Sequence, residues 1–144
     1  MTRWLLDTNV VSELRKPRPD QNVRSWLVAK LQADLLISRV TVAELRFGIA
    51  RAPTAEQRAR IAAWLNNELL PWFRGRIIEV DEAALIEWRV IMERGRQAGH
   101  TFPQPDALIA AIAAVNDLAI ATRNTVDFSK AGVAVANPWN DPPA

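Results

Sequence analysis

Four acidic residues stand at positions from which they could be gathered into one site. They are Asp7 in RWLLDTN, Glu44 in VTVAELRF, Asp106 in PDALIAA and Asp127 in RNTVDFSK. Intervals of 37, 62 and 21 residues separate them, so only the fold can bring them together. Crowded carboxylates raise one another's pKa unless a cation lies among them. Hard divalent ions such as Mg²⁺ or Mn²⁺ take oxygen ligands of this kind, and such a site suits hydrolysis of a phosphodiester.

Each acid also has an ordinary structural explanation. Asp7 can be a turn residue, and Glu44 fits a capping box with Thr41, in which the glutamate returns to the backbone of the cap. Asp106 follows a proline at a helix start, where the helix dipole favours acids. Asp127 in a polar loop can simply be solvated. The metal-site hypothesis therefore depends on the joint placement of the four acids.

Short apolar runs alternate with helical periodicity along the chain. This alternation predicts an α/β fold with a central parallel sheet of about five strands, flanked by helices on both faces. The predicted strands are residues 4–6, 35–38, 77–80, 118–122 and 133–136, and residues 123–132 are expected to form a loop. The predicted helices begin after caps at Asp20, Thr54 and Asp81, with Gly99 ending the third and Pro71 bending the second.

The predicted strands place the acids at one edge of the sheet. Asp7 directly follows the first strand, Glu44 lies in the first turn of the helix after the second, and Asp127 lies in the loop after the fourth. Asp106 opens a buried, alanine-rich helix that runs into the fourth strand. Functional sites of such sheets form at the carboxyl ends of the strands. We therefore expect all four acids to share one pocket.

Length and composition limit the rest of the molecule. The 144 residues are 49% hydrophobic, which predicts one domain over 1–144 with a proline-rich tail at 137–144. The absence of cysteine excludes disulfides and thiolate metal sites. No apolar run approaches the roughly 20 residues of a membrane span, so we expect a soluble, cytoplasmic protein.

Arginine makes up 15 of the 18 basic residues. With four acids neutralised by a metal, the formal charge would rise from +2 to +6, a surface that attracts a polyanion. An arginine-rich codon usage explains the same composition equally well.

Other active-site chemistries lack their residues. The only histidine, His100, is expected to be an exposed loop residue, so neither a two-histidine zinc site nor a Ser-His-Asp triad can form. The five glycines make neither a phosphate loop nor a dinucleotide fingerprint. A receiver-like, Mg²⁺-binding signalling domain remains an alternative, although no lysine stands at a late strand end. An inactive RNA-binding module is the other alternative.

The order and spacing of five segments resemble the motifs of a known family. LLDTNVVSELRKP, VTVAELRFGIAR, PDALIAAIAAV, ATRNTVDF and VANPW are similar to the successive motifs of PIN-domain ribonucleases, above all the VapC and FitB toxins of bacterial toxin–antitoxin pairs. The resemblance covers essentially the whole chain and implies a PIN-like α/β/α sandwich. It also implies a Mg²⁺- or Mn²⁺-dependent endoribonuclease.

The resemblance assigns the acidic core residue by residue. Asp7, Glu44 and Asp106 match the family's core acids, so each would bind the metal or orient its water. The fourth position is left open between Asn124 and Asp127, because some members carry an aspartate at the former and others at the latter.

The resemblance extends to neighbouring residues and to partners. Thr8, Asn9 and Thr122 would be polar neighbours of the pocket, and Arg46 either reaches substrate phosphate or is an ordinary solvated arginine. The implied partners are an RNA substrate, a second copy in a homodimer, and a VapB- or FitA-like DNA-binding antitoxin whose C-terminal segment lies in a groove of the toxin. The six tryptophans suit either a core or an interface.

Overall fold

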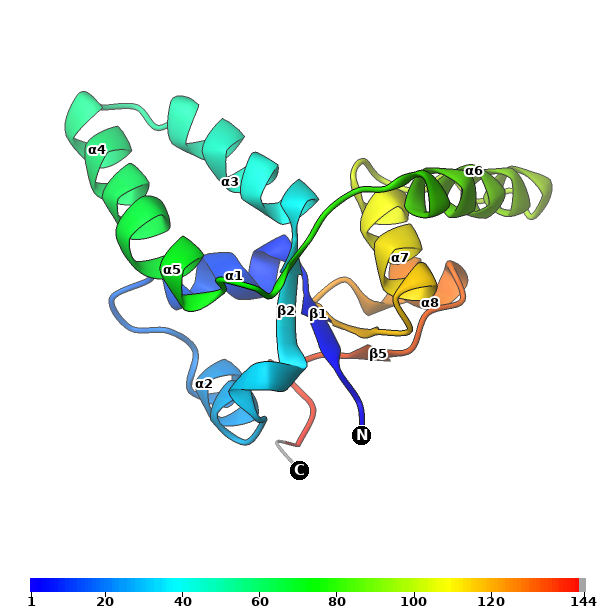
Figure 1. The fold of residues 1–144 in the computed structure, drawn as a ribbon, viewed down its shortest axis with the longest axis horizontal. Helices are drawn as coiled ribbons and strands as arrows, with labels where there is room; N and C mark the ends of the chain where they lie inside the picture. The colour runs from blue at the N-terminus through cyan, green and yellow to red at the C-terminus, as the bar shows by residue number, and fades with distance from the viewer. Residues whose placement is uncertain (143–144) are drawn as a thin grey trace.

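The computed structural model describes residues 1–142 and contains a central sheet between two groups of helices (Figure 1). The strands are β1 (Trp4–Leu6), β2 (Leu35–Ser38), β3 (Ile77–Ile78), β4 (Ala119–Ala121) and β5 (Val135–Ala136). The helices are α1 (Thr8–Leu14), α2 (Gln21–Val28), α3 (Arg39–Ala50), α4 (Ala55–Trp64), α5 (Leu70–Trp72), α6 (Glu82–Gln97), α7 (Asp106–Val115) and α8 (Thr125–Lys130). A 3₁₀ turn, η1 (Gln32–Asp34), and a π turn, η2 (Leu65–Leu69), complete the elements.

The sheet is parallel throughout, with strand order β3-β2-β1-β4-β5. Leu5 at the centre of β1 pairs with Leu36 of β2 on one side and with Ile120 of β4 on the other. The fold class predicted from the sequence is confirmed. The receiver alternative is wrong, because that doubly wound design orders its strands 2-1-3-4-5.

Alternate residues of the strands serve two separate cores. Leu5 and Ile120 face α6, α7 and α8, whereas Leu6 and Ala121 face the helices from α1 to α5. Figure 1 shows these two groups on opposite sides of the sheet. Strands buried on both faces need apolar residues at every position, which explains the continuous runs WLL and LLIS.

The predicted helix caps are present. Asp20, Thr54 and Asp81 each accept a hydrogen bond from a backbone N–H in the first turn of the following helix, and Gly99 ends α6 with a φ of 75°. The bend predicted at Pro71 stays a prediction, and a π turn, η2, directly precedes the short helix that contains this proline. Proline lacks an N–H to donate, and a wider turn accommodates that loss.

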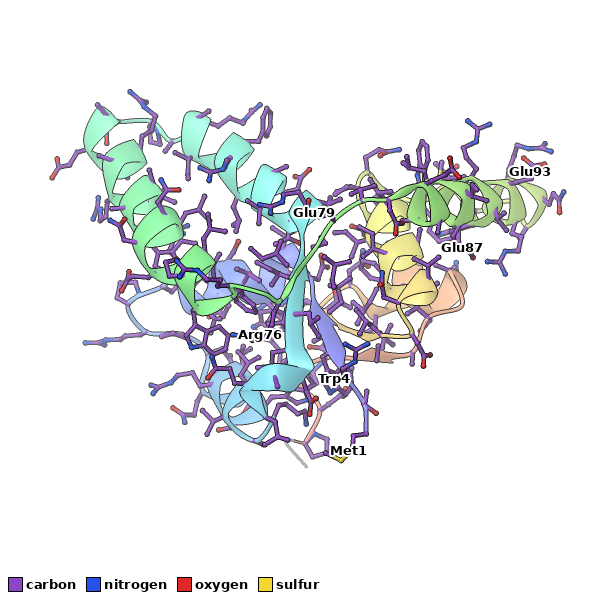
Figure 2. All side chains as sticks on the ribbon, in the orientation of Figure 1. Met1, Trp4, Arg76, Glu79, Glu87 and Glu93 are labelled. Carbon is purple, nitrogen blue, oxygen red and sulfur yellow. The ribbon has the colours of Figure 1, made fainter. Side chains whose placement is uncertain are left out.

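Arg76, which directly precedes β3, connects α5 to β2 through hydrogen bonds. The Arg76 guanidinium donates to the carbonyl oxygens of Leu35 and Gln32, at 2.6 and 2.7 Å, and to that of Trp72. It also lies 4.4 Å from the centre of the Trp72 ring. Further along, Glu79 pairs with Arg39 at 2.7 Å and links the segment after β3 to the start of α3 (Figure 2).

Several expectations from the sequence need correction. Residues 123–132 are not a loop, because Thr125–Lys130 form α8. The strands predicted at 77–80, 118–122 and 133–136 are shorter than expected. The capping box between Thr41 and Glu44 is absent, since α3 begins earlier and Ser38 is its N-cap.

The C-terminal segment and the tryptophans also take definite places. Residues 137–141 of the predicted tail form a turn, in which the backbone N–H of Asn137 donates to Asp141 and that of Trp139 to the Asn137 side chain. Trp26 is fully buried, whereas Trp72 is 44% exposed. Within residues 1–142, no helix has the length and apolar character of a membrane span.

Candidate active site

Asp7 lies at the junction of β1 and α1, where it is the N-cap of the helix. Its backbone N–H continues the sheet by donating to Ala121 O at 2.9 Å, which fixes the residue beside the end of β4. Its side chain is only 5% exposed. Burial raises the pKa of Asp7, and the hydrogen bonds from Thr122 and from the backbone of Thr8 oppose that rise. The chain thus holds a carboxylate in a place that disfavours its charge.

A network of short polar side chains holds the Asp7 carboxylate in place. Thr122, fully buried at the end of β4, donates its hydroxyl to Oδ2 of Asp7 at 2.7 Å. The same hydroxyl oxygen accepts the backbone N–H of Asn124 at 2.9 Å. Asn9 donates to Oδ2 of Asp7 at 3.3 Å, and Thr8 donates its backbone N–H to Oδ1 at 2.8 Å. Thr8, Asn9 and Thr122 therefore each donate a hydrogen bond to the carboxylate of Asp7.

Asp106 approaches from the other side of the sheet as the first residue of α7. Nδ2 of Asn124 donates to its Oδ2 at 2.6 Å. The pKa of Asp106 is raised from 3.8 to about 6, first by burial and then by the charge of Asp7, with smaller contributions from Asp127 and Glu44. The hydrogen bond from Asn124 opposes this rise. A carboxylate whose pKa is raised by a neighbouring carboxylate is stabilised in its charged form by a cation between the two.

Glu44 and Asp127 are not part of the hydrogen-bond network that holds Asp7 and Asp106. Glu44 is exposed on α3 and borders the same cavity as Asp7 and Asp106. Asp127 lies in the first turn of α8 rather than in a loop, and its Oδ1 is 2.9 Å from Nε2 of His100. The expectation of an exposed histidine without a partner is wrong, since only 21% of the His100 side chain is exposed.

The two candidates for the fourth position have different contacts. Asn124 donates directly to Asp106, whereas Asp127 faces His100, and neither residue borders the cavity. Arg46 also points elsewhere, because its guanidinium donates to Oδ1 of Asn66 at 3.2 Å. This contact favours the reading of Arg46 as an ordinary surface arginine.

Asp7, Glu44 and Asp106 share a cavity of about 470 Å³ at the carboxyl edge of the sheet, whereas Asp127, which was expected there too, does not border it. A fourth acid, two cations and an aromatic ring also border the cavity, and none of them was assigned to the site from the sequence: Glu13, Lys16, Arg123 and Trp139. Arg123 had a detectable signal, since it stands between Thr122 and Asn124 in ATRNT. Lys16 and Trp139 also stand in segments that carry the family resemblance, LLDTNVVSELRKP and VANPW, but their approach to the acids depends on how α1 and the C-terminal turn pack.

The donor set fits a hard divalent cation. Asp7 and Asp106 supply carboxylate oxygens on neighbouring elements, and Mg²⁺ is usually held by one or two carboxylates, waters and substrate phosphates. In the described part of the chain, no three histidine or acidic side chains are close enough to enclose an ion by themselves. The site thus suits a cation that keeps water ligands.

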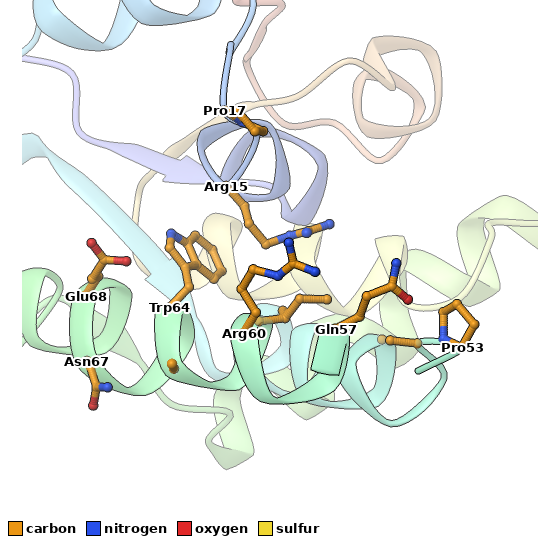
Figure 3. A pocket seen from close by; sticks show the side chains of 12 residues that line it. Arg15, Pro17, Pro53, Gln57, Arg60, Trp64, Asn67 and Glu68 are labelled. Carbon is orange, nitrogen blue, oxygen red and sulfur yellow. The ribbon is translucent and has the colours of Figure 1, made fainter. Parts of the chain in front are cut away.

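A larger hollow, of about 830 Å³, lies away from the acids. It is bordered by the end of α1, the C-terminal half of α3 and one face of α4 (Figure 3). Trp64 and Arg60 extend from α4 toward Arg15 at the end of α1 (Figure 3). Ile61 adds further apolar surface to the lining. Its shape and lining suit an extended or helical peptide better than a small polar substrate.

Comparison with known proteins identifies relatives along nearly the full chain. The family described as "PIN domain" matches residues 4–134. The "VapC ribonuclease Y4jK" of Sinorhizobium fredii is 38% identical over 135 residues, which are 94% of this chain and 96% of that protein. The "Toxin FitB" of Neisseria gonorrhoeae is 39% identical over 137 residues, 95% of this chain and 99% of that protein.

Solved structures agree with the sequence relatives. A chain in the crystal structure of FitAcB from Neisseria gonorrhoeae superposes with a TM-score of 0.90 at 38% sequence identity. The superposition covers 96% of this chain and 99% of that chain. The similarity therefore includes every element that carries the acids.

Proposed function

The chain belongs to the PIN-domain family, and on that premise we propose that it is a Mg²⁺- or Mn²⁺-dependent endoribonuclease and the toxin of a toxin–antitoxin pair. The names of its relatives, a VapC ribonuclease and a toxin, support the activity and the role. The observation that carries the proposal is the convergence of Asp7 and Asp106 on one cavity, where each carboxylate has a raised pKa.

Asp7 and Asp106 would hold the metal ion. A divalent ion there would supply a water activated for attack and would neutralise charge on the phosphate. Thr122 and the Thr8 backbone orient the carboxylate of Asp7, and Asn124 orients that of Asp106. These hydrogen bonds fix both carboxylates before substrate arrives, which reduces the cost of reorganisation.

Glu44 has a different part in the proposal. It borders the cavity from α3, and within residues 1–142 no hydrogen bond or ion pair engages its carboxylate. An acid of this kind at the mouth can accept the proton of an attacking water. Asp127 acts at a distance, through its charge on Asp106 and its contact with His100.

The proposed activity is tested by incubating total cellular RNA with the purified protein. We expect discrete fragments with Mg²⁺ or Mn²⁺ and none with a chelator, because the carboxylates need the ion to bind phosphate. Sequencing the fragment ends would identify the target. Absence of cleavage with either ion would contradict the nuclease and leave the inactive RNA-binding module.

We further propose that the large hollow of Figure 3 receives the C-terminal segment of the antitoxin. The apolar residues of its lining can pack against apolar side chains of a peptide, and its arginines can pair with acidic side chains. It begins beside α1 and α3, which also border the acid-lined cavity. A segment bound there could thus block access to the acids. We also propose that the protein acts in the cytoplasm, where RNA is available. The formation of a homodimer stays a prediction.

Gly48 provides a direct test of this groove. It lies within α3, and a Cβ added there would meet no atom within 4 Å. Gly48→Trp should fill the groove and weaken antitoxin binding by more than about tenfold, while RNA cleavage stays at the level of the original protein. Binding is measured by calorimetry with the antitoxin.

The matched control is Gly48→Ala. It adds only a methyl group and should stabilise α3 by about 1 kcal/mol without weakening binding. Equal antitoxin affinity in Gly48→Trp and Gly48→Ala would place the antitoxin segment elsewhere.

A further inference from the structure

Arg123 is a cation beside the acid-lined cavity that the proposed mechanism does not yet use. It directly follows Thr122, which holds Asp7, and precedes Asn124, which holds Asp106. Its backbone N–H donates to Oδ1 of Asn9 at 3.3 Å. The main chain of Arg123 is therefore fixed by the same network that orients both carboxylates, and its side chain borders their cavity.

The guanidinium of Arg123 rests on the ring of Trp139. Its Cζ lies 3.9 Å from the ring centroid, closer than in any other arginine–aromatic pair within residues 1–142. Two hydrogen bonds fix the backbone of Trp139. Its N–H donates to Oδ1 of Asn137 at 2.9 Å, and Nδ2 of Asn22 in α2 donates to its carbonyl oxygen at 2.8 Å. The C-terminal turn thus supplies a fixed platform for the cation.

The charge of Arg123 is not consumed by an ion pair. Among the described residues, no carboxylate lies within salt-bridge distance of its guanidinium. Glu13 is near enough for the charge of Arg123 to contribute to lowering its pKa, but the hydrogen bond with Lys16 is the larger cause. That carboxylate is already engaged by Lys16 at 2.9 Å and by the Asp20 N–H at 2.8 Å. Arg123 is exposed, so its N–H groups can reach a ligand.

We propose that Arg123 binds a phosphate of the RNA backbone that flanks the scissile bond, and that Trp139 positions its guanidinium. The proposal rests on the proposed function and deepens it. Stacking on an aromatic face leaves the edge of the guanidinium plane open for bidentate contact with phosphate oxygens. Asp7 and Asp106 mark the place of the scissile phosphate, and Arg123 stands at the rim of the same cavity.

Because this contact lies at the rim of the cavity, its loss should affect substrate binding more than the rate of the chemical step. Arg123→Ala should raise KM for a short single-stranded oligoribonucleotide by about 20-fold, since a charge-assisted bidentate contact is lost, and should change kcat by less than about threefold. Trp139→Leu should raise KM by a smaller factor, and Trp139→Phe should restore most of the loss because an aromatic face remains.

A second measurement separates a phosphate contact from a merely structural effect. In the Asp7→Asn background, binding of a fluorescein-labelled oligoribonucleotide is followed by anisotropy at several salt concentrations. Removing Arg123 should reduce the slope of log K against log salt by about 0.7, the value for one phosphate on a single strand. A purely structural role would weaken binding without changing that slope.

Arg51 provides the matched control. It also lies over an aromatic ring, 5.4 Å from the centroid of Phe47, but borders neither the acid-lined cavity nor the large hollow. Arg51→Ala should leave KM and the salt slope unchanged. An unchanged KM and slope in Arg123→Ala would overturn the inference, as would equal changes in Arg51→Ala. If the original protein cleaves no RNA, the proposed function fails, and the anisotropy measurement still decides whether Arg123 binds phosphate.

Discussion

Replacing Asp7 by asparagine is expected to lower the rate of RNA cleavage at least about a thousandfold, the equivalent of roughly 4 kcal/mol of transition-state stabilisation. Asparagine has nearly the same shape, its amide oxygen can still accept the backbone N–H of Thr8, and its NH2 group can donate to the Thr122 hydroxyl in place of the present bond, so the fold should persist. It lacks the negative charge that attracts a divalent ion. The measurement is single-turnover cleavage of an oligoribonucleotide at saturating Mn²⁺.

Asp20 offers a matched control for this substitution. Like Asp7, it is the N-cap of a helix, and its carboxylate accepts the backbone N–H groups of Asn22 and Val23. It does not border the acid-lined cavity. Asp20→Asn should therefore cleave RNA at the original rate. Comparable activity of Asp7→Asn and the original protein would refute the assignment of Asp7 as a metal ligand.

Replacing Asp106 by asparagine is expected to abolish cleavage and yet to stabilise the metal-free protein. The pKa of Asp106 is raised from 3.8 to about 6, so folding at neutral pH keeps a charge where the protein disfavours it. Asp106 is only partly buried, and after a discount for solvent screening roughly 1 kcal/mol remains. The melting temperature at pH 7.5 should rise by about 3 °C.

The pH dependence of this effect has a definite sign. Folded Asp106 binds its proton more tightly than the unfolded chain does, so between pH 4 and 6 the folded state carries more protons. The stability that Asp106 contributes is fully present below pH 3.8 and is lost as pH rises through about 6. The difference in melting temperature between Asp106→Asn and the original protein should therefore be small near pH 4 and reach its full value above pH 6.

Added metal should reverse the order of stability. Mn²⁺ binds the folded original protein and raises its melting temperature, whereas Asp106→Asn has lost a ligand and should respond weakly. A metal-free Asp106→Asn protein that melts below the original at every pH would contradict the argument. Asp117→Asn is unsuitable as a control because Asp117 has a positive φ of 56°, so Asp20→Asn serves again.

Both acids lower the stability of the metal-free protein, because each carboxylate is held where its charge is disfavoured. Asp7 is almost fully buried and Asp106 is crowded by other charges, so the folded chain without metal is less stable than it would be with neutral residues there. Active sites often carry such a cost, because the arrangement that suits the bound state is unfavourable in the empty one.

The parallel sheet, the helix caps and the positions of Asp7 and Asp106 could all be predicted from local patterns in the sequence. Continuous apolar runs such as LLIS and caps such as Asp81 are local signals, and each reports its structure within a few residues. Asp7 and Asp106 were also predictable, because their positions depend only on where a strand ends and where a helix begins.

The packing of distant segments settles which further side chains meet these two acids. Asn124 rather than Asp127 contacts Asp106 because α8 begins at Thr125 and turns Asp127 toward His100. Trp139 comes beneath Arg123 because the C-terminal turn packs against α2, more than a hundred residues earlier in the chain. Such contacts join segments that are distant in sequence, and no local pattern of residue types records the packing that brings them together.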